Sequence, residues 1–157
     1  MKKVLIGILV VAIAACCCGC VCLPTGGTNK KVSEFYDKVS EAQELLEIVG
    51  DDIYDNWHAA IYDDEFNDDI DLAVSMAQID NADNIDRLEE LDEEISELFR
   101  DIKDSKHSDL IKDVMYAYDD YYELVVNVSG SFNDFSDKNE DLNDELVSAL
   151  NALSYEI

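Results

Sequence analysis

One stretch of sequence decides the fold class: SDLIKDVMYAYDDYYELVVNVSGSFNDFSDKNEDLNDELVSALNALSY, residues 108–155. Apolar side chains recur along it at alternating steps of three and four residues. They are Ile111, Val114, Tyr118, Tyr121, Val125, Val128, Phe132, Phe135, Leu142, Leu146, Ala149 and Leu153, and only Asn139 interrupts them. This spacing places them on one stripe of an α-helix, and so long a repeat is typical of helices that pack against partners of similar length. We therefore expect one long helix here, with the rest of the chain folded against it.

A second stripe with the same spacing lies upstream, between residues 32 and 61. It predicts a long amphipathic helix that ends near Tyr62, with Thr28 or Asn29 as its N-terminal cap. Gly50 lies inside this helix and weakens it by about 1 kcal/mol relative to alanine, without moving the phase of the stripe.

The third stripe covers residues 70–102, and Asn81 and Asn84 interrupt it at its middle. The polar patch at 80–84 is either a break or a polar layer that sets the register of the helices. Because the phase is unchanged across the patch, one helix is favoured. The sequence thus predicts an all-α, up-down-up bundle of three long antiparallel helices with coiled-coil-like packing, or four helices if residues 80–84 form a turn.

The charge of the chain limits its partners. Its 157 residues suit a single domain, and 37 acidic against 11 basic side chains give a formal net charge of −26. Such a surface repels phosphate groups, which argues strongly against nucleic acid and against anionic lipid headgroups as docking partners. Weak, diffuse binding of divalent cations is expected, because cations relieve this self-repulsion.

The first residues have the composition of an export signal. Two lysines at positions 2 and 3 precede an apolar run to residue 15, which predicts a signal peptide over 1–15. Ile13-Ala14-Ala15-Cys16 resembles the lipobox of prokaryotic membrane lipoproteins, with isoleucine where leucine is commonest. The resemblance covers only residues 1–16. It implies a diacylglyceryl group on Cys16 and cleavage before that residue.

An uncleaved anchor is the alternative, because residues 4–23 form an apolar run long enough to span a bilayer. Either route places the chain from residue 25 onward on the extracytoplasmic side of the cell membrane. All five cysteines lie within residues 16–22, where further acylation, for example by palmitate, or metal binding is less favoured than a simple apolar role. Residues 16–28 then form a cysteine-rich anchor and flexible tether, and residues 29–157 form the acidic helical bundle.

No arrangement of residues indicates an enzyme. The sequence has no nucleophile-elbow motif, no cysteine after Cys22 and no phosphate-binding glycine loop. His58 and His107 each follow an aspartate by three residues, as in the carboxylate-histidine pairs of di-iron bundles. They fall off the apolar stripe and in an expected turn, respectively. We therefore expect no catalytic site, no metal site and no cofactor.

Two features are candidates for recognition. Tyr116 and Tyr122 flank the apolar stripe of residues 108–155 and could contact a partner, although packing within the bundle is the simpler role for tyrosines here. Asn127-Val128-Ser129 is an N-glycosylation sequon, which gives Asn127 a role only where exported proteins are glycosylated.

The leader, the tether and the bundle together predict a membrane-anchored extracytoplasmic lipoprotein. Its helical domain would be a non-enzymatic spacer, or a docking surface for another envelope protein. The alternative is an accessory module of an envelope complex that binds a small ligand or a divalent cation. Its pocket would open between helices near Asn81, Asn84 and Asn139, the polar interruptions of the stripes.

Overall fold

The computed structural model of the protein describes residues 26–63 and 65–157. They form five α-helices and one short turn, and no strand occurs among them, so the all-α prediction is confirmed. The elements are α1 (Gly26–Tyr62), the turn η1 (Glu65–Asp68), α2 (Ile70–Asp80), α3 (Ala82–Ile102), α4 (Ser108–Val126) and α5 (Phe132–Ser154).

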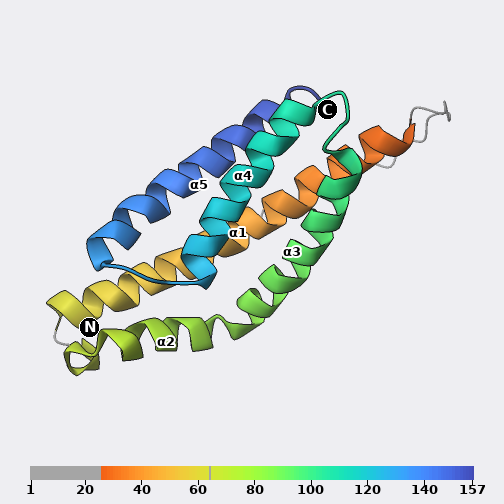
Figure 1. Cartoon of the computed structure of the whole chain (residues 1–157). Coiled ribbons are helices and arrows are strands. Elements are labelled where there is room, and N and C mark those ends of the chain that lie inside the picture. Colours follow the sequence, from red (N-terminus) through yellow and green to blue (C-terminus); the bar gives the residue numbers. More distant parts are fainter. Residues whose placement is uncertain (1–25, 64) are drawn as a thin grey trace, which may run out of the picture.

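The centre of the bundle is α1, not the stretch 108–155 that was expected to organise it. In Figure 1, α1 runs the length of the molecule, with α2 and α3 along one side and the hairpin of α4 and α5 along the other. It contacts each of the four other helices, whereas α5 touches only α1 and α4 among the described elements. Among the described helices, α1 alone packs against all of the others.

The prediction for the α1 segment is confirmed at its apolar face and at its C-terminal end. The helix ends at Tyr62, and one continuous row of side chains is buried along it: Val32, Phe35, Val39, Ala42, Leu46, Val49, Ile53, Trp57 and Ala60. Its start differs from the expectation, because the helix begins at Gly26, two residues before Thr28. Thr28 and Asn29 therefore lie within the first turn.

The prediction of one helix over residues 108–155 is wrong. Helix α4 ends at Val126, the chain reverses through residues 127–131, and α5 returns antiparallel beside α4 (Figure 1). Gly130 has φ 94°, a left-handed conformation that cannot continue a right-handed helix. Ser131 then caps α5, because its Oγ accepts a hydrogen bond from the backbone nitrogen of Asp134 at 3.2 Å. The apolar stripe keeps its phase in the sequence because Val128, within the reversal, and Phe132, at the start of α5, are both half-buried against the core.

The segment 70–102 is also divided, at Asn81. This residue has φ −103° and ψ 19°, and α2 and α3 run in clearly different directions on its two sides (Figure 1). Its side-chain Nδ2 donates to the carbonyl oxygen of Ala77 at 3.1 Å and to Oδ2 of Asp52 on α1 at 2.7 Å. The break falls within the polar patch 80–84 and bends the chain without reversing it. The described residues thus form five α-helices, where three were expected, or four with a turn at residues 80–84.

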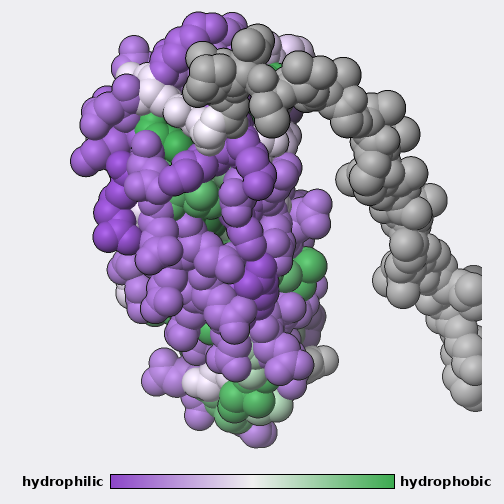
Figure 2. Space-filling model, turned by 90° about the vertical axis from the view of Figure 1, so that its right-hand side faces the viewer, coloured by the Kyte–Doolittle hydropathy of each residue, from purple (hydrophilic) through white to green (hydrophobic). Residues whose placement is uncertain are grey.

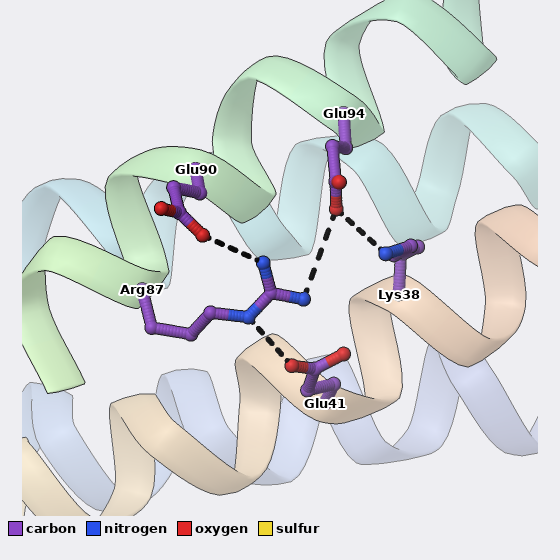
Figure 3. A network of polar contacts seen from close by, with 5 residues as sticks. All are labelled: Lys38, Glu41, Arg87, Glu90 and Glu94. Carbon is purple, nitrogen blue, oxygen red and sulfur yellow. Dashed lines mark hydrogen bonds and ion pairs between the residues drawn. The ribbon is translucent and has the colours of Figure 1, made fainter.

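Ion pairs tie α3 to α1. Arg87 donates through Nε to Glu41 at 2.8 Å and through Nη1 to Glu90 at 3.0 Å, and Lys38 donates to Glu94 at 2.6 Å (Figure 3). Lys38 lowers the pKa of Glu94, mainly through this hydrogen bond. Two of the few basic side chains, Lys38 and Arg87, thus lie between acidic side chains of α1 and α3 that would otherwise repel one another.

Candidate functional site

Helix α2 carries its large apolar side chains on the outside. Ala73 and Ala77 are its buried residues, and they face the core beside α1. Leu72, Met76 and Ile79 are 44%, 37% and 65% exposed, and their spacing of four and three residues places them on one outer face. A surface helix normally turns its largest aliphatic side chains inward. Helix α2 therefore presents an apolar stripe with no cover from the described part of the chain.

A pocket of about 650 Å³ opens beside this stripe. Ile70 and Val74 of α2 line one wall, Trp57 of α1 lines the floor, and Val128 and Phe132 lie on the other side, around the α4–α5 reversal. The ring of Phe132 lies 5.9 Å from that of Trp57, in an edge-on arrangement. The indole Nε1 of Trp57 is buried and has no hydrogen-bond partner among the described residues. We call α2 and this pocket the apolar tip.

The apolar tip lies at one end of the bundle. Figure 2 shows hydrophobic residues gathered at the lower end of a surface that is otherwise largely hydrophilic. The turn η1 leads into this end with Phe66, Asn67 and Asp68 at φ 56°, 53° and 59°, a left-handed conformation that is costly for residues other than glycine. Asp69 then caps α2 by accepting from the backbone nitrogen of Leu72 at 3.0 Å. This cap fixes where α2 begins.

Negative charge surrounds the apolar tip. Between residues 39 and 86 the sequence has 15 aspartates and glutamates and no lysine or arginine. This segment contains most of α1, the turn η1 and all of α2. A molecule that covers the apolar tip must therefore approach through a field that favours cations.

The three asparagines expected near a pocket are divided between two sides of α1. Asn81 accepts from Nδ2 of Asn84 at 2.9 Å and donates to Asp52, on the side of α2 and α3. Asn139 of α5 donates to Asp51 over 3.5 Å, on the other side. Asn139 lines a groove between α1 and α5, and neither Asn81 nor Asn84 lines that groove.

That groove runs between α1 and α5 and has a volume of about 310 Å³. Glu47, Asp51 and Glu140 give it an acidic rim, and Tyr121 of α4 lies at its floor. The pKa of Asp51 is raised by burial and by the neighbouring charges of Glu47 and Asp55. The sequence-based interpretation missed Tyr121 here, because a tyrosine on the apolar stripe reads as core.

The tyrosines that were expected to contact a partner do not share a surface. Tyr116 is 62% exposed, whereas Tyr122 is half-buried and its ring lies 5.7 Å from that of Tyr118. Six residues along an α-helix turn through about 240°, so the two side chains leave α4 in different directions. Asn127 is exposed at the end of α4 and donates to Glu123 at 2.8 Å. Neither the partner role of the tyrosines nor glycosylation of Asn127 has a counterpart in these contacts, and both stay predictions.

The structure separates the two histidines. His58 lies in an aromatic group at the end of α1, 4.7 Å from the ring of Tyr62, and His107 precedes α4 near the opposite end of the bundle. Within residues 26–63 and 65–157, no three histidine, cysteine, aspartate or glutamate side chains are placed to hold a metal ion.

The predicted lipid site Cys16 and the predicted anchor 4–23 lie outside the described residues. None of the described helices combines the length and the apolarity needed to cross a bilayer.

The apolar tip could have been anticipated from the sequence. In residues 70–80, IDLAVSMAQID, apolar side chains cover more than half of the helix surface, and the remaining face carries Asp71, Ser75 and Gln78. So wide an apolar face is more than contact with one neighbouring helix can cover. The predicted stripe contains only Ile70, Val74 and Ala77. It leaves out a second set of large side chains, Leu72, Met76 and Ile79.

Comparisons with protein families, with curated proteins and with solved structures give no match.

Proposed function

We propose that this protein is a membrane-anchored extracytoplasmic lipoprotein, and that its helical domain is a non-enzymatic docking module for another envelope protein. One observation carries this proposal: the large aliphatic side chains of α2 face outward, at the opposite end of α1 from its start at Gly26. The 37 residues of α1 span about 55 Å at 1.5 Å per residue. A tether before Gly26 would therefore hold the apolar tip far from the membrane surface.

The partner we propose is an amphipathic helix with an apolar face and flanking lysines or arginines. Its apolar face matches the stripe of Leu72, Met76 and Ile79, and its basic flanks match a segment, 39–86, that has no basic side chain of its own. A second copy of the chain is a poorer occupant, because two copies at −26 each repel one another.

The anchor is tested by intact mass of the full chain from a prokaryotic host. We expect it in the membrane fraction, beginning at Cys16 and carrying the mass of the attached lipid. Cys16→Ala should leave the uncleaved precursor, whereas the matched control Cys18→Ala should be processed normally. A wild-type chain of full length in the membrane would indicate the 4–23 anchor, and one found only in the cytosol would contradict both routes.

The docking surface is tested with the full chain in nanodiscs of zwitterionic lipid, with empty nanodiscs as the blank. The probe is a synthetic amphipathic helix of leucine and lysine in 0.15 M salt. The triple variant Leu72→Gln, Met76→Gln, Ile79→Gln should weaken binding at least about tenfold, which needs a loss of only ~1.4 kcal/mol. These side chains are exposed, so the fold should survive.

Two controls make the docking result specific. Ile48→Gln with Val147→Gln removes apolar side chains that are also exposed, on α1 and α5 outside the apolar tip, and should leave binding unchanged. A scrambled peptide of the same composition should bind weakly. Equal binding by the triple variant would show that charge alone attracts the probe. If the wild-type chain forms a dimer and the triple variant is monomeric, a second copy of the chain is the occupant instead.

A further inference from the structure

The groove between α1 and α5 has a hydroxyl group at its floor that lacks a partner. Tyr121 is fully buried, yet its Oη has no hydrogen-bond partner among the described residues. Its neighbour on the same helix differs, because Tyr118 donates through Oη to Asp92 at 3.2 Å. A buried hydroxyl is normally paired with protein, water or a ligand. Tyr121 lines the groove, so an occupant of the groove would supply the missing contact.

The rim of the groove is negatively charged, and no basic side chain lines the groove to balance this charge. Glu47 and Asp51 come from α1 and Glu140 comes from α5, and no lysine or arginine lines the groove. Asp51 and Glu47 lie near enough to Tyr121 to raise its pKa, after burial, which is the larger cause. An occupant with positive charge and hydrogen-bond donors would therefore satisfy the hydroxyl and the carboxylates together.

The size and the ligand set of the groove favour an organic cation over a metal ion. Its volume of about 310 Å³ equals roughly ten water molecules at ~30 Å³ each, far more than one ion needs. Its three carboxylates are not among any group placed to hold a metal ion in the described part of the chain. An ammonium group has three N–H donors and no acceptor, which suits a site made of carboxylates and a hydroxyl oxygen. Tyr54 also lines the groove, and an aromatic ring can attract a cation.

We propose that this groove binds a small aliphatic amine, whose ammonium group donates hydrogen bonds to Tyr121 Oη and to the carboxylates of Asp51 and Glu47. Asn139 donates a hydrogen bond from its Nδ2 to Asp51 and so positions that carboxylate. In a diamine, the second ammonium group would pair with Glu140 at the rim. The site is independent of the apolar tip, because it lies between α1 and α5 and shares no lining residue with it.

The test is calorimetric titration of the full chain, in zwitterionic nanodiscs and 0.15 M sodium chloride, with cadaverine as the probe. We expect saturable binding of one equivalent to the wild type. Tyr121→Phe removes only the unpartnered oxygen and should weaken binding at least about tenfold while the chain stays folded. Tyr118→Phe is the matched control, since its hydroxyl already has a partner, and should bind within about twofold of wild type.

A second pair of variants separates the groove from the general charge of the surface. Asp51→Asn should abolish measurable binding, whereas Glu44→Gln, an exposed acid of α1 outside the groove, should not change it. Equal binding by Tyr121→Phe or by Asp51→Asn would overturn the proposal and leave diffuse attraction to an acidic surface. Magnesium chloride that binds with the same dependence on Tyr121 would also overturn it, in favour of a metal ion.

Discussion

Gly50 is the residue of α1 against which Asn139 of α5 packs. A Cβ atom at this position would lie 2.4 Å from Oδ1 of Asn139, which is 8% exposed and wedged against α1. The same Asn139 donates its Nδ2 to Asp51. A glycine that costs helix stability in an isolated α1 therefore permits a close helix–helix contact in the folded bundle.

We expect Gly50→Ala to lower the free energy of unfolding by about 1 kcal/mol, because overpacking of ~1–3 kcal/mol outweighs the helix preference of alanine, ~1 kcal/mol. Denaturant unfolding measures it. In a chain that already carries Asn139→Ala, the same substitution should become stabilising, since the clash is gone. Gly27→Ala, where a Cβ meets nothing within 4 Å, is the control and should not destabilise. A stabilising Gly50→Ala in the wild type would contradict the close contact.

The sequence reveals the polarity of such residues but not their partners. Asn139 stands out as the one interruption of its apolar stripe, and that much is visible in the sequence. Its partners Gly50 and Asp51 lie 88 residues or more away, on a helix whose rotation about its axis is set only by packing. The groove beside them could not be predicted for the same reason.

At the scale of elements, the apolar period predicted helices well and their ends poorly. The end of α1 at Tyr62 coincides with the end of its stripe. The breaks at Asn81 and at residues 127–131 do not, because apolar residues on both sides keep one phase and all pack on α1 or its neighbours. The sequence nevertheless carries a local signal at each break. Asn81, which is buried in the structure, interrupts the apolar stripe at the first break, and Ser129-Gly130-Ser131 lies at the second. Where helices fold back on each other, short turn sequences therefore predict the helix ends better than the apolar period does.

Arg87 is the element-level link between α1 and α3. Arg87→Gln should lower the melting temperature by a few degrees, because Glu41, Glu90 and Glu94 then repel one another with no cation between them. Thermal unfolding by circular dichroism measures it, and the difference should shrink in ~1 M salt. Arg100→Gln is the control, since the ion pair of Arg100 among the described residues is with Glu97 of its own helix, at 3.7 Å. Equal effects of the two variants would contradict a link between helices.

Over the whole molecule, the two ends differ in charge. Most basic residues after the leader gather where α1 starts, α3 ends and α4 starts: Lys30, Lys31, Arg100, Lys103, Lys106 and Lys112. Lys31 pairs there with Asp101 at 2.6 Å, and the pKa of Lys31 is raised by this hydrogen bond. Around the apolar tip, by contrast, residues 39–86 contain aspartates and glutamates but no lysine or arginine. The net charge of −26 hides this division, because a sum over the chain carries no information about position.

The central position of α1 has a mechanical consequence. If the leader is fixed in the membrane and a partner pulls on α2, tension passes along the chain from α2 through η1 into α1 and on to the anchor, against the order of the sequence. The α4–α5 hairpin lies beside this path and is packed along α1. Its contacts with α1 would then oppose the unwinding of that helix under tension.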